Sequence, residues 1–146
     1  MNVINKIIRG IANAVYNEFG ENYRIYTENI EQGLDAPCFS IVCISPGVKQ
    51  FLGARYKGEY LFALHYFPKN SENARAECYN VIERLYSVLE YIEVDGDLMR
   101  GTNTSASITD GVVSFIVHYD MFFYRKNNAE KMESLKTYNK IKNGDL

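Results

Sequence analysis

The sequence predicts an α+β fold, in which a mixed, mostly antiparallel sheet packs against two amphipathic helices in the order helix, strands, helix, strands. Two segments, residues 2–19 and about 71–91, repeat apolar side chains with the 3.6-residue period of a helix. Residues 112–124 instead alternate apolar and mixed positions, which is the pattern of a strand. A chain of 146 residues has the length of one domain.

The two helices have recognisable boundaries. Gly20 stands where the C-cap glycine of the first helix is expected, and Gly10 weakens the same helix by up to about 1 kcal/mol relative to alanine. The second helix follows Pro68, with Asn70 or Ser71 as its expected cap, and runs to about Tyr91. Its apolar stripe consists of Ala74, Cys78, Val81, Ile82, Leu85, Val88 and Leu89.

The remaining segments are predicted to be strands and turns. Residues 38–45 are apolar on both faces, so they should form a strand covered on both sides that ends at Pro46-Gly47. Residues 47–58 are more polar and flanked by glycines, which predicts an extended hairpin arm. Asp110-Gly111 is a strong two-residue turn signal. The other strands are expected at residues 24–29, 59–67, 92–100 (interrupted near Asp95-Gly96) and 102–109.

The formal charge of −2 is unevenly distributed. Residues 125–146 contain six Lys and Arg against three Asp and Glu, a net of +3, which leaves −5 for the other residues. The sequence therefore predicts an α+β domain over residues 1–126 and a basic, mobile tail over 127–146. This balance gives no bulk reason for sequence-specific binding of nucleic acid or for binding a membrane.

Signals for secretion or membrane insertion are not found. Lys6 and Arg9 interrupt what would be the apolar core of a signal peptide, and no apolar run has the length of a membrane span. Cys38, Cys43 and Cys78 form an odd set without paired spacing, which favours buried, reduced thiols over a disulfide or zinc site. We therefore expect a cytosolic protein.

No group of residues predicts catalysis or a cofactor. His65 and His118 each lie in the middle of an apolar strand, and Asp120 is two positions from His118 on the same face. A contact between that pair is possible, but a structural hydrogen bond is the favoured interpretation. Asp95-Gly-Asp97 lacks the remaining ligands of a calcium loop, and no glycine run precedes a helix to hold a phosphate. We expect no enzyme, no metal site and no cofactor.

Surplus aromatic surface points to assembly instead. The strand at 112–124 has aromatic side chains on both faces, and the arm at 47–58 is basic. A monomer would have to cover such surfaces, whereas a subunit of an oligomer uses them. The candidate interface residues are Lys49, Phe51, Arg55, Lys57, Phe122, Tyr124, Arg125 and Lys126.

The order of these segments resembles the tail terminator, or tail completion, proteins of bacteriophages and phage-derived contractile particles, especially those of Gram-positive prophages. The resemblance covers about residues 1–126. It rests on the N-terminal helix and on four further segments, which are "IYTENIEQGLDAPCFSI" (25–41), "YLFALHYFP" (60–68), "SENARAECYNVIERLYSVLEYI" (71–92) and "VSFIVHYDMFFYRK" (113–126).

The resemblance implies a structural subunit that forms a ring, typically of six, at the head-proximal end of the tail tube. In contractile particles such a ring also caps the sheath and presents a surface to the head connector or collar. The implied partners are other copies of the chain, the tube protein, and sheath or connector proteins. The protein would be in the host cytoplasm during assembly and then in the particle.

Two other functions fit the same pattern of elements. One is another part of the virion, such as a head–tail connector, built on a similar mixed sheet. The other is a small ligand-binding or enzymatic α+β domain with a pocket around His118, Asp120 and tyrosines, which should be a monomer or dimer. The sequence alone does not distinguish a contractile from a non-contractile tail, or a phage from a bacteriocin particle.

Overall fold

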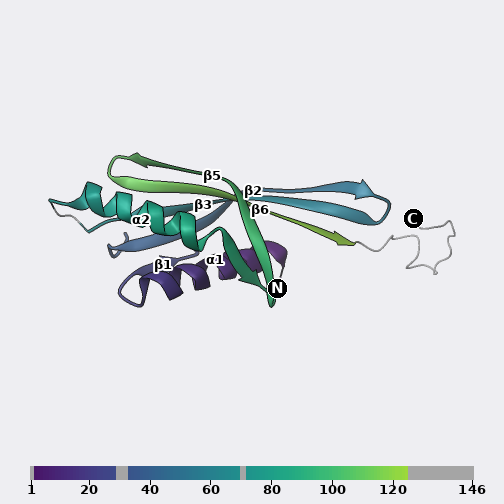
Figure 1. The fold of residues 1–146 in the computed structure, drawn as a ribbon, viewed down its shortest axis with the longest axis horizontal. Coiled ribbons are helices and arrows are strands. Elements are labelled where there is room, and N and C mark those ends of the chain that lie inside the picture. Colours follow the sequence, from purple (N-terminus) through teal and green to yellow (C-terminus); the bar gives the residue numbers. More distant parts are fainter. Residues whose placement is uncertain (1, 29–32, 70–71, 125–146) are drawn as a thin grey trace. The chain divides into compact units, whose positions relative to one another are not determined.

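A computed structural model describes residues 2–28, 33–69 and 72–124. These residues form two helices and six strands (Figure 1), namely α1 (Val3–Phe19), β1 (Arg24–Tyr26), β2 (Cys38–Leu52), β3 (Arg55–Phe67), α2 (Ala74–Val88), β4 (Tyr91–Val94), β5 (Asp97–Thr109) and β6 (Val112–Tyr124). The chain divides into two compact units. The first comprises Met1–Pro46 and Tyr60–Tyr119, and the second comprises Gly47–Glu59 and Asp120–Leu146.

The strands form one six-stranded sheet in the order β1-β2-β3-β6-β5-β4. β1 is parallel to β2, whereas β4 with β5 and β5 with β6 are antiparallel. The predicted α+β class, with a mixed sheet and the order helix, strands, helix, strands, is therefore confirmed. Asp110 and Gly111 both have positive φ, at 53° and 77°, and they make the predicted turn between β5 and β6.

The core of the first unit consists of alternate residues of the central strands. The four side chains of β6 that the alternation places inward are all at most 1% exposed, and the corresponding side chains of β3 are buried as well. The residues are Val113, Phe115, Val117 and Tyr119 of β6, and Tyr60, Phe62, Leu64 and Tyr66 of β3. The predicted alternation is confirmed over these residues, while Met121 and Phe123, which continue the same face of β6, are only half-buried.

Both helices cover the same face of the sheet in this unit. Phe19 of α1 packs on Phe39 of β2 with ring centroids 4.8 Å apart, and Tyr86 of α2 packs edge-on against Phe115 at 5.0 Å. The helices also contact each other, because the Arg84 guanidinium donates to the Glu18 carboxylate at 2.8 Å. The other face of the sheet has no helix among the described residues.

This one-sided cover corrects the prediction for residues 38–45. Val42 and Ile44 of β2 are 42% and 50% exposed, so the strand is not buried on both sides. β2 also does not end at Pro46-Gly47 but continues to Leu52. β1 pairs with β2 only as far as Ser40, so the residues of β2 after Ser40 have no partner on the β1 side.

The second helix is shorter than predicted at both ends. It begins at Ala74, with Asn73 as an N-cap that makes no side-chain hydrogen bond; Asn70 and Ser71 lie outside the described residues. It ends at Val88, and Tyr91 already belongs to β4. The two carbonyls that follow the helix accept from distant donors rather than from a further helical turn. Leu89 O accepts from the Tyr119 hydroxyl at 2.6 Å, and Glu90 O accepts from Gly101 N at 2.7 Å.

The predicted strand over residues 92–100 is in fact a hairpin. Asp95 and Gly96 both have positive φ, at 54° and 83°, as the central residues of a type I′ turn do. The chain therefore reverses there, so that β4 pairs with the beginning of β5, with Glu93 opposite Leu98. Asp95 also forms an ion pair with Lys6 of α1 at 2.8 Å, which agrees with a structural turn.

The first helix agrees with its prediction, but Gly10 has a role that its sequence does not show. The Asn2 side chain accepts from Asn5 N at 2.8 Å at the beginning of α1, and Gly20 with φ 90° is the C-cap. A Cβ atom at Gly10 would lie 2.8 Å from Glu93 O and 3.1 Å from a Val94 methyl group. The glycine therefore allows α1 to approach β4, which is the last strand of the sheet.

We expect Gly10→Ala to destabilise the protein, although alanine is the better helix former. The gain in propensity of about 1 kcal/mol is outweighed by a clash with backbone, for a net loss of about 1–2 kcal/mol in the free energy of unfolding. Urea denaturation of both proteins measures the difference. Asn13→Ala is the matched control on an exposed position of α1 and should change stability by less than about 0.5 kcal/mol. Equal or greater stability of Gly10→Ala contradicts the packing argument.

Candidate assembly surface

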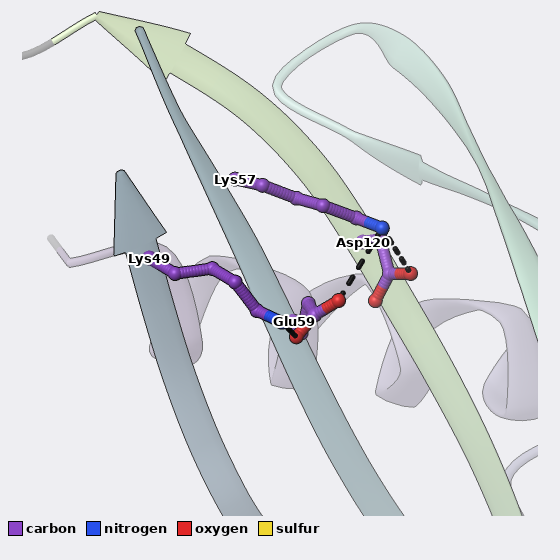
Figure 2. A network of polar contacts seen from close by, with 4 residues as sticks. All are labelled: Lys49, Lys57, Glu59 and Asp120. Carbon is purple, nitrogen blue, oxygen red and sulfur yellow. Dashed lines mark ion pairs between the residues drawn. The ribbon is translucent and has the colours of Figure 1, made fainter. Parts of the chain in front are cut away.

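A chain of alternating charges lies on the second unit, formed by the far part of β2, the beginning of β3 and the end of β6. Figure 2 shows Lys57 between two carboxylates, with Nζ 3.3 Å from Glu59 and 3.9 Å from Asp120. Lys49 of β2 reaches the same Glu59 at 3.4 Å. The hydrogen bond from Lys57 and the positive charge of Lys49 hold the pKa of Glu59 below its usual value. The three strands are thus joined by ion pairs.

An aromatic cluster lies beside these charges. The rings of Phe51 and Phe122 meet edge to face with centroids 5.2 Å apart. The Arg55 guanidinium lies over both rings, 5.5 Å from the centroid of Phe51 and 4.8 Å from that of Phe122, and Lys57 Nζ is 6.0 Å from Phe122. These distances are those of cation–π contacts. Arg55 has no ion pair with another described residue, so the two rings are its contacts in this cluster.

The second unit exposes further apolar side chains outside this cluster. Leu52 at the end of β2 is 72% exposed, and Tyr124 at the end of β6 is 79% exposed. Tyr56 and Phe123 stack with centroids 6.0 Å apart and an interplanar angle of 22°. No helix of the described chain belongs to this unit, so its aromatic side chains are not covered by a helix and pack against one another instead.

The structure brings together most of the residues that the sequence suggested as an interface. Lys49, Phe51, Arg55, Lys57 and Phe122 form one connected group through the contacts above. Tyr124 lies two residues beyond Phe122 on the same strand, whereas Arg125 and Lys126 lie outside the described residues.

Sequence reasoning missed the two carboxylates that hold this group in place. Glu59 alternates with Arg55 and Lys57 along β3, and Asp120 alternates with Phe122 along β6. Period-2 alternation could therefore have placed both on the charged face. It could not have shown that β3 and β6 are neighbours.

The histidines do not form a catalytic pair with the residues suggested for them. Asp120 is in the ion chain with Lys57, and Nδ1 of His118 has no hydrogen-bond partner among the described residues. The structural hydrogen bond favoured for His118 is thus not found at this nitrogen. Within the described residues, no group of three or more His, Cys, Asp or Glu could hold a metal ion.

The three cysteines are free in the described chain. Cys38 and Cys78 are buried, as predicted, but Cys43 is half-buried because it lies on the exposed part of β2. Burial raises the pKa of all three thiols, with the charge of Asp35 adding to the effect at Cys38. Burial keeps these thiols protonated and so disfavours a nucleophilic role.

A groove of about 510 Å³ lies in the first unit, between α1 and the β4–β5 hairpin. Its helix side carries Arg9, Asn13 and Asn17, and its hairpin side carries Tyr91, Glu93 and Leu98. Neither histidine lines it. No helix in the described part of the chain is long and apolar enough to cross a membrane.

Comparison with known proteins gives one informative match. The model of a family described as "Phage tail terminator protein" matches residues 6–131. A search of curated proteins finds no match. A solved structure with 12% sequence identity covers 86% of this chain and 100% of its own, with a TM-score of 0.36.

Proposed function

The chain belongs to the phage tail terminator family, and we propose that it is the subunit of a six-membered ring that caps the head-proximal end of a tail tube. In a contractile particle the same ring also caps the sheath and meets the connector or collar. The subunits assemble in the host cytoplasm and remain in the virion or phage-tail-like particle. The family match and the predicted interface residues support this proposal, because the proteins of this family are described as structural parts of a phage tail.

The observation that carries the proposal is the aromatic and cationic cluster of the second unit. Aromatic residues and arginine are enriched where proteins bind each other, and here they lie on strands that no helix of the unit covers. The ion chain of Lys49, Glu59, Lys57 and Asp120 stiffens this surface before binding, which reduces the entropy lost on association. The surface thus serves contacts with the tube and with other subunits.

We expect the double variant Phe51→Ser/Phe122→Ser to lose assembly while keeping its fold. Each substitution removes a ring that is about half exposed, at 56% and 47%, so little stability is lost. In cells that make the particle, electron microscopy should show tubes of irregular, extended length, because growth is no longer stopped. Purified wild-type protein should form rings by light scattering and negative stain, and the variant should not.

A matched control distinguishes the surface from general loss of aromatic residues. Tyr16→Ser/Tyr79→Ser removes two helix-borne rings of similar exposure, at 51% and 53%. This variant should cap tubes at the wild-type length. Tubes of uniform length with both variants would contradict the assembly role of the cluster.

A further inference from the structure

We infer that the groove between α1 and the β4–β5 hairpin receives the arm of a second copy of this chain, the arm being residues 47–58. This inference rests on the proposed function and adds to it the surface by which one subunit holds the next. The arm and the groove are different surfaces, so each copy offers both and the contact is head to tail. A head-to-tail contact with the right rotation closes into a ring.

The first observation is the charge of the two units. Counted along the sequence, the first unit has seven Lys and Arg against thirteen Asp and Glu, a formal charge of −6. The second unit has nine against five, a formal charge of +4. Two copies therefore attract each other most strongly when the second unit of one meets the first unit of the other.

The second observation is where the negative charge lies at the groove. The segment from residue 90 to residue 99 has four carboxylates and no Lys or Arg. Asp95 is neutralised by Lys6 at 2.8 Å, whereas Glu90, Glu93 and Asp97 have no ion pair with another described residue. The charged residues that line the groove are Lys6, Arg9, Glu93 and Asp95, a net charge of zero, so the acceptor that the groove offers is the carboxylate of Glu93 rather than a bulk negative charge.

The third observation is the match between apolar and charged groups on the two surfaces. Glu93 lies directly opposite Leu98 across the hairpin, and Leu98 is 74% exposed. On the arm, Leu52 is equally exposed and Arg55 follows it just after the turn at residues 53–54. One surface thus carries an exposed leucine opposite Glu93, which has no ion pair with another described residue. The other carries an exposed leucine three residues before Arg55, whose guanidinium lies over Phe51 and Phe122 and has no ion pair with another described residue. Tyr91 provides a further apolar wall.

The groove also has a suitable size. Its volume of about 510 Å³ lies within the range of about 300–1,000 Å³ that is typical of binding pockets. The amides of Asn13 and Asn17 provide donors and acceptors for the backbone of a hairpin tip. The groove therefore fits the tip of the arm rather than a whole strand face.

Cysteine cross-linking within assembled particles tests this arrangement directly. In a Cys43→Ser background, a chain with both Leu52→Cys and Leu98→Cys should form disulfide-linked ladders beyond the dimer on mild oxidation. Each single variant should give at most dimers. The matched control is Leu52→Cys with Ser107→Cys, which places the second thiol on an exposed part of β5 away from the hairpin, and it should give no ladder. A ladder with this control, or none with Leu98→Cys, overturns the inference.

Charge exchange provides a second test that does not depend on thiols. Arg55→Glu and Glu93→Arg should each weaken subunit association at least about tenfold in light-scattering titrations. An equimolar mixture of the two variants should recover association, because alternating subunits restore opposite charges at every contact. Absence of recovery, with both variants folded, counts against the groove as the acceptor.

The failure of this inference and of the proposed function have different signatures. If the arm binds only the tube, ladders and charge rescue are absent, but tubes are still capped at uniform length by the wild-type chain. If particles made without the chain already have tubes of uniform length, the capping function itself is wrong, whatever the cross-links show.

Discussion

Replacing Gly101 with alanine is expected to lower the free energy of unfolding by about 3 kcal/mol. A Cβ atom at this position would lie 2.6 Å from Leu89 O, 2.8 Å from a Val117 methyl group and 3.2 Å from the Tyr119 ring. Leu89 O cannot move away easily, because it accepts the Tyr119 hydroxyl at 2.6 Å. Gly101 N is itself held by Glu90 O at 2.7 Å. The end of α2 and the middle of β5 and β6 therefore meet at a point with no room for a side chain.

Guanidinium denaturation of the wild type and of Gly101→Ala measures this loss. Ser107→Ala is the control, since it places the same methyl group on an exposed position of the same strand, and should change stability by less than about 0.5 kcal/mol. If Gly101→Ala is as stable as Ser107→Ala, the close approach of these three elements is wrong.

The same region illustrates what the sequence could and could not predict about the fold. The inward faces of β3 and β6 followed from period-2 alternation, and α1 followed from its apolar stripe and its C-cap glycine. The end of α2 did not, because the two carbonyls just after the helix, those of Leu89 and Glu90, accept from Tyr119 and Gly101 instead of continuing the helix. Those donors are eleven and thirty residues away, beyond any local signal.

The length of β2 shows the same limitation. Pro46-Gly47 is a strong local stop signal, yet the strand continues for six residues after Pro46. A local stop signal of this kind does not record which neighbouring strands pair with the segment in the folded chain. Val42 and Ile44 are exposed because both helices pack on the other face of the sheet, and the residues of β2 alone do not predict which face the helices cover.

The candidate surface was predictable only in part for related reasons. Composition identified Lys49, Arg55 and Lys57 as an unusual basic group on a segment without a helix stripe. It could not show that Phe122, more than sixty residues later, lies under Arg55. The groove was missed entirely, because its walls come from α1 and the β4–β5 hairpin and exist only after the chain has folded.

Raising the pH above about 9 is expected to destabilise the protein steeply. Burial, followed by the hydrogen bond to Glu77, raises the pKa of Tyr66, and burial raises the pKa of Tyr119. A pKa raised by folding means that the unfolded chain ionises first, at about pH 10 for tyrosine. The stabilising effect of each phenol is complete below that pH and is lost as the pH rises toward the folded pKa. Burial also raises the pKa of Cys38 and Cys78. Because a thiol of the unfolded chain ionises at about pH 8.5, these two residues begin to destabilise the fold at a lower pH than the tyrosines do.

Urea titrations at successive pH values measure how steeply the free energy of unfolding falls with pH. Above pH 10 each of the two tyrosines should remove about 1.4 kcal/mol of unfolding free energy per pH unit, so Tyr66→Phe and Tyr119→Phe should each flatten the profile by that amount. Tyr119→Phe should also be less stable at neutral pH, because the buried Leu89 O loses its donor. Tyr124→Phe, on a ring that is 79% exposed, is the control for the loss of a surface hydroxyl. A profile that stays parallel to the wild type in both buried variants would show that these phenols ionise equally in the folded and the unfolded chain, so that burial does not raise their pKa.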